Sequence, residues 1–390
     1  MSSKTYDRYS YRRRKKKRYF GIFEIIVAVL AVVTILCAYA GNIDPRDFFM
    51  APFMVLGFMP MVILLLALLV ASMIWRRWWS ILMIVVALLA SLSTIKVFVP
   101  MNTIENLPPM PADTTLTLKV MTYNVLGFNY NEPEYSDEAS ASMRMILDAN
   151  PDVVLLQEGT AGGVEWKEIP SLTPLMGEIE AKYPYIYCSG EGLNIMSKYP
   201  FTTEPLCEPQ HARSPLGYNR EQSSYLARAY DLQLPNGKQL RLVDFRFQSY
   251  HLSFGKSMNA RVSPDVKSSA LERMRRSFAL RGDNAAAVRK ALDASPANLI
   301  VCGDMNDVPA SHVYHVIRGN DLKDAWMNAG RGYAYTYNRH HLKFRIDHIF
   351  YRGEVQALRA ERLVGGSSDH YPLMVTFDFD TVSRRNENKD

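Results

Sequence analysis

Three long apolar runs within the first 100 residues constrain this chain more than any other feature. They extend over Tyr19–Ala40, Phe48–Trp75 and Trp78–Val99, and together they contain only two charged side chains. A helix that spans a bilayer needs about 20 apolar residues, and each run reaches that length. A cleaved secretory signal fits poorly, because its apolar region covers only about 7–15 residues. The sequence therefore predicts three transmembrane helices within residues 19–100.

The distribution of charge predicts how these helices are oriented. Residues 1–18 have nine basic side chains and one acidic side chain, although the whole chain has a net charge of only +6. A basic segment beside a membrane span stays in the cytoplasm. The loop "GNIDPRD" has one Arg and two Asp, whereas Arg76 and Arg77 make the next loop basic. We expect a basic cytoplasmic tail, a multi-pass inner-membrane protein, and residues 101–390 on the extracytoplasmic, periplasmic side.

The rest of the chain predicts one large α/β domain. A proline-rich linker at 101–115 precedes it, and a polar tail at 381–390 follows it. Between residues 116 and 380, strand-like and helical segments alternate. The stretch "LPNGKQ" predicts a hairpin turn between two strands, which a purely parallel sheet would not contain. Two packed mixed sheets flanked by helices account for this order.

Acidic and amide side chains collect where the predicted strands end. In "VCGDMNDVP", Asp304 and Asn306 are two residues apart, so both side chains point to the same face of an extended strand. Carboxylate and amide oxygens favour Mg²⁺ or Mn²⁺ over zinc, and such a cation attracts phosphate. If the sheets pack face to face, these ends converge on one cleft. The candidate residues are Asn124, Glu158, Asp304, Asn306, Asp347, Asp369 and His370.

Six motifs occur in an order that resembles the endonuclease/exonuclease/phosphatase superfamily, which includes the pancreatic-type deoxyribonucleases. They are "MTYNVLGF", "VVLLQE", "MSKYP", "VCGDMNDVP", "RIDHIF" and "SSDHYPL". The resemblance covers about residues 116–379, and the whole chain is similar to membrane-tethered bacterial members. It implies a four-layer α/β sandwich. It also implies Mg²⁺-dependent hydrolysis (Mn²⁺ is an alternative) of phosphodiester or phosphomonoester bonds by in-line attack of an activated water.

The resemblance assigns a role to most of the candidate residues. Glu158 would be the main metal carboxylate, with Asn124 and Asp369 as further metal residues. Asp304 would orient or deprotonate the attacking water. Asn306 would bind the phosphate. These assignments make the strand ends a metal-dependent hydrolytic site.

The assignment of histidines depends on one alignment. His370 would pair with Asp369 and contact the scissile phosphate, while Asp347 would help to set its geometry. Family members have another histidine in a stretch like "NNHLQS", where this chain has "DFRFQSYHLSF". Alignment on "QS" places Arg246 at the position of that histidine, and alignment on "HL" places His251 there. The two residues are five apart, so in one regular strand their side chains point to opposite faces and cannot both face the site. We favour the alignment that selects Arg246, which can bind phosphate but cannot shuttle a proton. A β-bulge in this strand would instead allow His251 to face the site.

Two classes of function follow from these observations. The first is a membrane-anchored hydrolase that acts on a nucleic acid, a phospholipid headgroup or a sugar phosphate. The second is a catalytically silent module of the same fold that binds a phosphate ligand. Residues 101–390 have a net charge of −3, which disfavours avid nonspecific binding to duplex DNA. Membrane lipid is the expected partner of the N-terminal helices, and no obligate protein partner is expected.

Overall fold

The structure is a computed structural model, and it places most of the chain. The basic tail 1–18, His251 and the polar tail 381–390 lie outside the described residues. The described residues are 21–111, 117–129, 138–159, 164–190, 192–207, 227–235, 237–249, 270–339 and 342–379.

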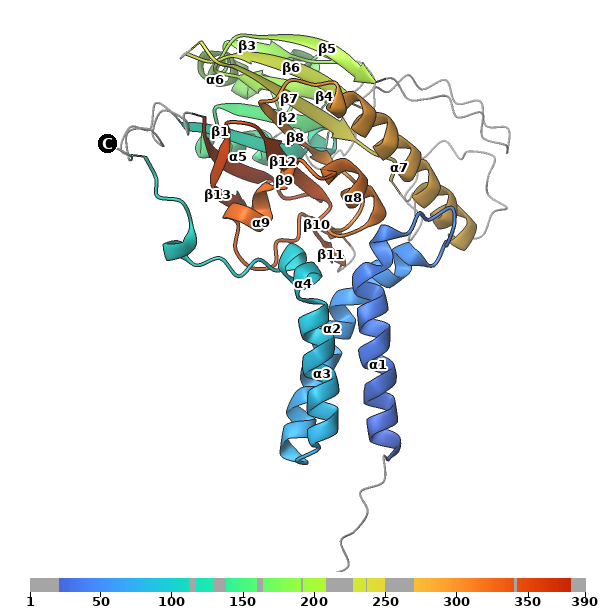
Figure 1. Ribbon diagram of the computed structural model, residues 1–390. Coiled ribbons are helices and arrows are strands. Elements are labelled where there is room, and N and C mark those ends of the chain that lie inside the picture. The colour runs from blue at the N-terminus through green and yellow to red at the C-terminus, as the bar shows by residue number, and fades with distance from the viewer. Residues whose placement is uncertain are drawn as a thin grey trace, which may run out of the picture.

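The apolar runs form a helical stalk below an α/β domain (Figure 1). Helices α1 (Ile22–Tyr39) and α2 (Ala51–Ile74) are long and apolar enough to cross a membrane. The third run differs from the single predicted helix, because α3 (Trp78–Ala90) and α4 (Leu92–Phe98) meet at 61°. The described residues thus contain two candidate spans, or three if the bent pair is one span.

The α/β domain contains two mixed sheets of six strands each. The spatial order of the first is β13 (Gln356–Arg362), β14 (Leu373–Asp378), β1 (Thr117–Asn124), β2 (Val153–Gln157), β4 (Leu193–Ser197) and β3 (Tyr185–Tyr187). The order of the second is β5 (Phe201–Cys207), β6 (Ala227–Gln233), β7 (Gln239–Arg246), β8 (Leu299–Asp304), β12 (Asp347–Arg352) and β9 (Lys323–Asp324). A separate hairpin joins β10 (Tyr337–Arg339) to β11 (Leu342–Phe344).

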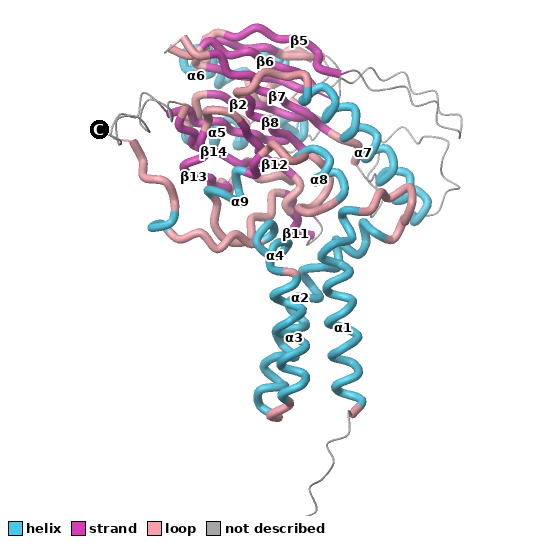
Figure 2. The backbone as a smooth tube through the Cα atoms, viewed as in Figure 1, coloured by secondary structure: helices cyan, strands magenta, loops and turns pink. Residues whose placement is uncertain are grey.

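Helices cover the outer face of each sheet, which gives four layers (Figures 1 and 2). Apolar side chains of α5 (Ala141–Ala149) and α6 (Met176–Lys182) pack on the first sheet. Those of α7 (Ala270–Asp293) and α8 (His312–Arg318) pack on the second. A third apolar core lies between the sheets. The predicted four-layer α/β sandwich is confirmed. The short helices are α9 (Ala325–Ala329), η1 (Ala40–Asn42), η2 (Ile104–Asn106), η4 (Leu126–Asn129), η6 (Trp166–Glu168) and η7 (Thr173–Leu175).

Strand register brings the polar strand ends to one end of the sandwich. In the second sheet, Asp304 at the end of β8 lies between Arg246 of β7 and Asp347 of β12. In the first sheet, Asn124 ends β1 beside the end of its parallel neighbour β2, and Glu158 follows directly. Both strands of the parallel pair in each sheet therefore end at the same edge, as the site hypothesis requires.

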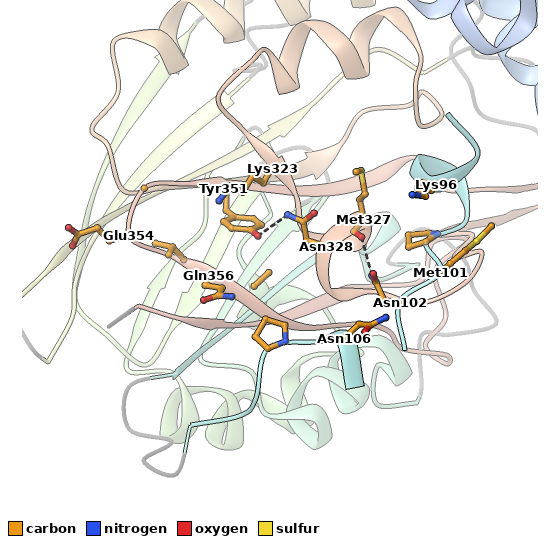
Figure 3. A pocket seen from close by; sticks show the side chains of 15 residues that line it. Lys96, Met101, Asn102, Asn106, Lys323, Met327, Asn328, Tyr351, Glu354 and Gln356 are labelled. Carbon is orange, nitrogen blue, oxygen red and sulfur yellow. Dashed lines mark hydrogen bonds between the residues drawn. The ribbon is translucent and has the colours of Figure 1, made fainter. Parts of the chain in front are cut away.

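The linker after α4 is fixed to the α/β domain by hydrogen bonds. The side chain of Asn102 donates to the carbonyl oxygens of Met327 and Gly330, at 3.0 and 2.7 Å. Arg345, buried in an ion pair with Asp324 at 3.2 Å, donates to the carbonyl oxygen of Val97 at 2.7 Å. A cavity of about 760 Å³ lies under this linker, away from the polar strand ends (Figure 3). The linker and the end of α4 thus contact the α/β domain through side-chain hydrogen bonds.

A glycine next to Asp304 is required by the close approach of two strands. Gly303 has φ 148°, and a Cβ atom there would lie 1.9 Å from the carbonyl oxygen of Phe245 on β7. We expect Gly303→Ala to lower the free energy of unfolding by roughly 3–5 kcal/mol, because backbone must move. Gly177→Ala is the matched control, since its Cβ would meet nothing within 4 Å. Thermal unfolding of the full-length protein in detergent measures both; equal melting temperatures would contradict the prediction.

Candidate active site

Two aspartates and a histidine form the buried centre of the site. Asp304 and Asp347 are each 1% exposed, and His370 is 5% exposed. One potential ligand atom of each lies within 4.8 Å of the others. The Nδ1 atom of His370 and the Oδ2 atom of Asp347 are 2.9 Å apart, within hydrogen-bonding distance. Three of the predicted site residues therefore meet, although they come from β8, from β12 and from the segment before β14.

The ionisation of this group follows from burial and from mutual attraction. Burial opposes the charge on His370, but the carboxylates of Asp347 and Asp304 outweigh it and raise its pKa to about 10. Burial raises the pKa of Asp304 to about 6, against the opposing effect of His370. At neutral pH the histidine is thus a cation that donates its Nδ1 proton to Asp347.

Asn124 connects the two sheets at the site. Its Nδ2 atom donates to the Oε1 atom of Glu158, at 2.9 Å, and to the Oδ2 atom of Asp304, at 3.1 Å. Glu158 adopts a left-handed backbone conformation, with φ 54°, directly after β2. Its side chain also forms an ion pair with Arg246, at 2.6 Å. One amide thus holds a carboxylate from each sheet in place.

Asn306 holds Asp304 in position. Its backbone N–H donates to the Oδ1 atom of Asp304 at 2.8 Å, and its side-chain amide donates to Oδ2 at 3.0 Å. The same amide donates to the carbonyl oxygen of Phe247 at 3.0 Å. The residue has φ 49°, so the chain turns sharply after the strand. The structure therefore fixes both oxygens of Asp304.

Among the predicted residues that the structure describes, Asp369 lies apart from this hydrogen-bonded group. The carboxylate of Asp369 lies 3.4 Å from the guanidinium of Arg339, and His370 pairs with Asp347 rather than with its neighbour. Arg246, at the end of β7, is the register partner of Asp304 and pairs with Glu158; the choice between the two alignments stays a prediction. The competing candidate, His251, lies outside the described residues.

Sequence reasoning missed the neutral side chains that support the charged ones. The hydroxyl of Thr336 accepts hydrogen bonds from the backbone N–H groups of Ile346 and Asp347, at 3.0 and 3.1 Å. Ser368 donates to the carbonyl oxygen of Asn124 at 2.7 Å and accepts from the N–H of His370 at 3.1 Å. Only Ser368 had a signal in the sequence, since it belongs to the motif "SSDHYPL".

The donor atoms fit a hard divalent cation. The Oδ1 atom of Asp347 is buried and has no hydrogen-bond partner among the described residues. Carboxylate oxygens of Asp304 and Glu158 lie on either side of the Asn124 amide. An oxygen-rich set of this kind suits Mg²⁺ or Mn²⁺. A bound cation would give the unpartnered oxygen of Asp347 a partner and would neutralise part of the negative charge of the carboxylates.

Comparison with known proteins agrees with this geometry. The sequence matches the profile described as the endonuclease/exonuclease/phosphatase family over residues 121–370, more than half of the chain. The chain belongs to the endonuclease/exonuclease/phosphatase family. Residues 20–98 match a domain of unknown function. No curated protein matches the chain.

Several solved structures are similar to this family member at low sequence identity. TDP2 from D. rerio, complexed with a single-strand DNA product, is 18% identical over 67% of this chain and 98% of its own, with a TM-score of 0.45. The human Nocturnin catalytic domain with bound sulfate is 17% identical over 67% and 93%, with a TM-score of 0.41. A mannosyl-6-phosphatase from Bacteroides thetaiotaomicron is 15% identical over 67% and 99%, with a TM-score of 0.41.

The raised pKa of His370 makes a prediction about stability. A histidine whose folded pKa exceeds its unfolded value stabilises the protein fully below about pH 6.5, and this stabilisation is lost as pH rises through about 10. The buried Asp304 acts in a separate window, because its raised pKa makes stability fall between about pH 4 and 6. Between pH 7 and 10, His370 therefore contributes more than Asp304 to the pH dependence of the wild-type stability.

We expect His370→Gln to flatten the pH dependence of stability. Between pH 7 and 10, in EDTA, the wild type should lose more stability than the variant, by on the order of several kcal/mol. Denaturant unfolding of the full-length protein at both pH values measures this difference. Lysines and tyrosines that titrate in this range are present in both proteins, so their contributions cancel when the two losses of stability are compared. Equal losses in the two proteins would show that His370 is not the cation of the buried group.

Proposed function

We propose that this protein is a membrane-anchored, divalent-metal-dependent phosphoesterase that hydrolyses phosphate esters by in-line attack of an activated water. The observation that supports it best is the buried group of Asp304, Asp347 and His370, which Asn124 connects to Glu158. A purely structural cluster would not need two adjacent buried carboxylates, one of which, Asp347, has an oxygen without a hydrogen-bond partner among the described residues. Unpaired buried charge is costly.

The residues divide into a metal side and a phosphate side. Glu158, Asn124 and Asp304 would hold Mg²⁺ or Mn²⁺, which would neutralise phosphate charge and polarise the ester when bound. Asp304 would also orient or deprotonate the attacking water. Asp369, which faces Arg339, remains a further metal candidate.

Cationic and neutral donors would hold the phosphoryl group. His370, kept protonated and oriented by Asp347, would donate from Nε2 to a phosphoryl oxygen. Arg246 lies at the same strand ends and would bind phosphate as a permanent cation. Asn306 would serve by fixing Asp304, and its amide would reach phosphate only by exchanging one of its present bonds. Charge stabilisation of this kind is the main task in phosphoryl transfer.

The stalk supports a location in a bacterial inner membrane. Helices α1 and α2 are long enough to span it, with α3 and α4 as a bent third span. The basic tail would lie in the cytoplasm and the α/β domain in the periplasm. Substrates would be phosphate esters of nucleic acids, lipid headgroups or sugars that reach this surface.

An assay with matched variants tests the proposal. The full-length protein in detergent should hydrolyse bis-p-nitrophenyl phosphate, DNA, RNA, sphingomyelin or a sugar phosphate with Mg²⁺ or Mn²⁺, and EDTA should abolish turnover. Asp304→Asn should lower kcat by about 10²–10⁴-fold, because it removes the base. Asp231→Asn is the control, since that carboxylate pairs with Arg241 on β7, away from the site. No turnover on any ester, with Mn²⁺ bound by calorimetry, would contradict the hydrolase.

The second candidate is a silent module that binds a phosphate ligand, and Arg246 is its motive. Arginine cannot donate a proton at neutral pH, and here it pairs with Glu158. If the protein is a hydrolase that uses Arg246 to bind phosphate, Arg246→His should raise KM about ten-fold or more without raising kcat. Arg246→Lys, which keeps the charge, should lose less. Activity that appears only in Arg246→His would instead identify the wild type as silent.

A further inference from the structure

The loop that follows β8 rests on the top of the helical stalk. Within it, Val308 and Ala310 are only 3% and 2% exposed. Both belong to one apolar cluster with residues of α1, η1, α2 and α4. This loop starts at Asp304 and Asn306, so a few residues separate the candidate catalytic carboxylate from the stalk. The stalk residues of the cluster are Cys37, Ala38, Ala40, Ala51, Val55, Phe58, Val62 and Phe98.

Backbone touches backbone at the centre of this contact. A Cβ atom on Gly41 would lie 1.8 Å from the carbonyl oxygen of Ala310 and 2.9 Å from its carbonyl carbon. Only glycine permits that approach without movement of one backbone. Alongside it, the Nε2 atom of His312 lies 3.8 Å from Asp44 in the turn between α1 and α2. The turn therefore fits the loop closely.

The loop has a conformation that needs outside support. Asn306 and Ala310 have φ angles of 49° and 59°, in the left-handed region that costs roughly 1–2 kcal/mol for residues with a Cβ. Such conformations persist where surrounding contacts determine them. On the far side of the loop from β8, that support includes the stalk cluster and Gly41.

Helix α7 gives the turn a second connection to the site. Phe278 packs edge-on against Phe53 of α2, with ring centroids 5.3 Å apart, and Asp283 pairs with Arg46 of the turn at 2.6 Å. Between these two residues on α7, the fully buried Arg281 donates to the carbonyl oxygen of Gln248 at 3.1 Å and lies 3.5 Å from the carboxylate of Asp307. Figure 1 shows the end of α7 beside this part of the stalk.

We propose that the turn between α1 and α2, residues 41–51, positions the catalytic loop at residues 304–311, with Gly41 and Arg281 as positioning residues. Gly41 supports the loop directly, and α7 ties the same turn to the residues that follow Arg246 and Asp304. The membrane region is then part of the catalytic apparatus and not only an anchor. This inference rests on the proposed function for its kinetic consequence, whereas the contact itself is testable without it.

Gly41→Val in the full-length protein, in phosphatidylcholine nanodiscs, tests the contact. Gly57→Val is the control, because a Cβ at that position of α2 would meet nothing within 4 Å. Hydrogen exchange of residues 304–311 should become at least ten-fold faster in Gly41→Val and stay unchanged in Gly57→Val. On the ester that the wild type cleaves, kcat should fall at least ten-fold while KM changes little. Unchanged exchange in the loop would overturn the proposal.

A gentler pair of variants applies if Gly41→Val does not fold. Asp44→Ala with Arg46→Ala removes the polar contacts of the turn to His312 and Asp283, and Glu165→Ala with Lys167→Ala removes a surface pair elsewhere. Exchange of residues 304–311 should rise at least three-fold in the first double variant only. Equal exchange in both would overturn the proposal. If the wild type cleaves no ester, the phosphoesterase proposal fails, but the exchange data still decide whether the turn positions the loop.

Discussion

Two carboxylates lie opposite each other on neighbouring strands, and the rest of the site is organised around that contact. Asp304 and Asp347 are register partners of β8 and β12 and are both buried. At separations below 4.8 Å, two negative charges repel by on the order of 3 kcal/mol at an effective dielectric constant near 20. A protein keeps both members of such a pair ionised only with cations beside them. His370 supplies one, and the oxygen-rich group around Asn124 is suited to a second.

The fold makes that contact possible without any local sequence signal for it. Parallel pairing of β7 with β8 and of β1 with β2 brings four strand ends to one edge. Packing of the two sheets then brings Asn124 of one sheet against Asp304 of the other, at 3.1 Å. The site therefore depends on the apolar core between the sheets, and a shift of one sheet against the other would break it.

Much of this was predictable from the sequence, for physical reasons that also explain the failures. The runs that became β2 and β8 are buried on both faces, so they read as continuous apolar strands. Polar residues that end such strands are easily seen. The sequence did not indicate that Asp369 lies beside Arg339, because that arginine is remote in sequence; the assignment of Asp369 to the metal remains a prediction. The role of Thr336 was not predicted, because a single neutral hydroxyl gives no charge or spacing signal in the sequence. The bend between α3 and α4 lies in an unbroken apolar run, which contains no local signal for it.

The central claim is that these side chains hold a hard divalent cation for phosphate chemistry. The most direct measurement is anomalous diffraction from crystals of the full-length protein soaked in Mn²⁺. The account predicts a manganese peak between the carboxylates of Glu158 and Asp304, close to the Asn124 side chain that contacts both. Peaks only at surface carboxylates, with Glu158 still paired to Arg246 at millimolar Mn²⁺, would contradict it.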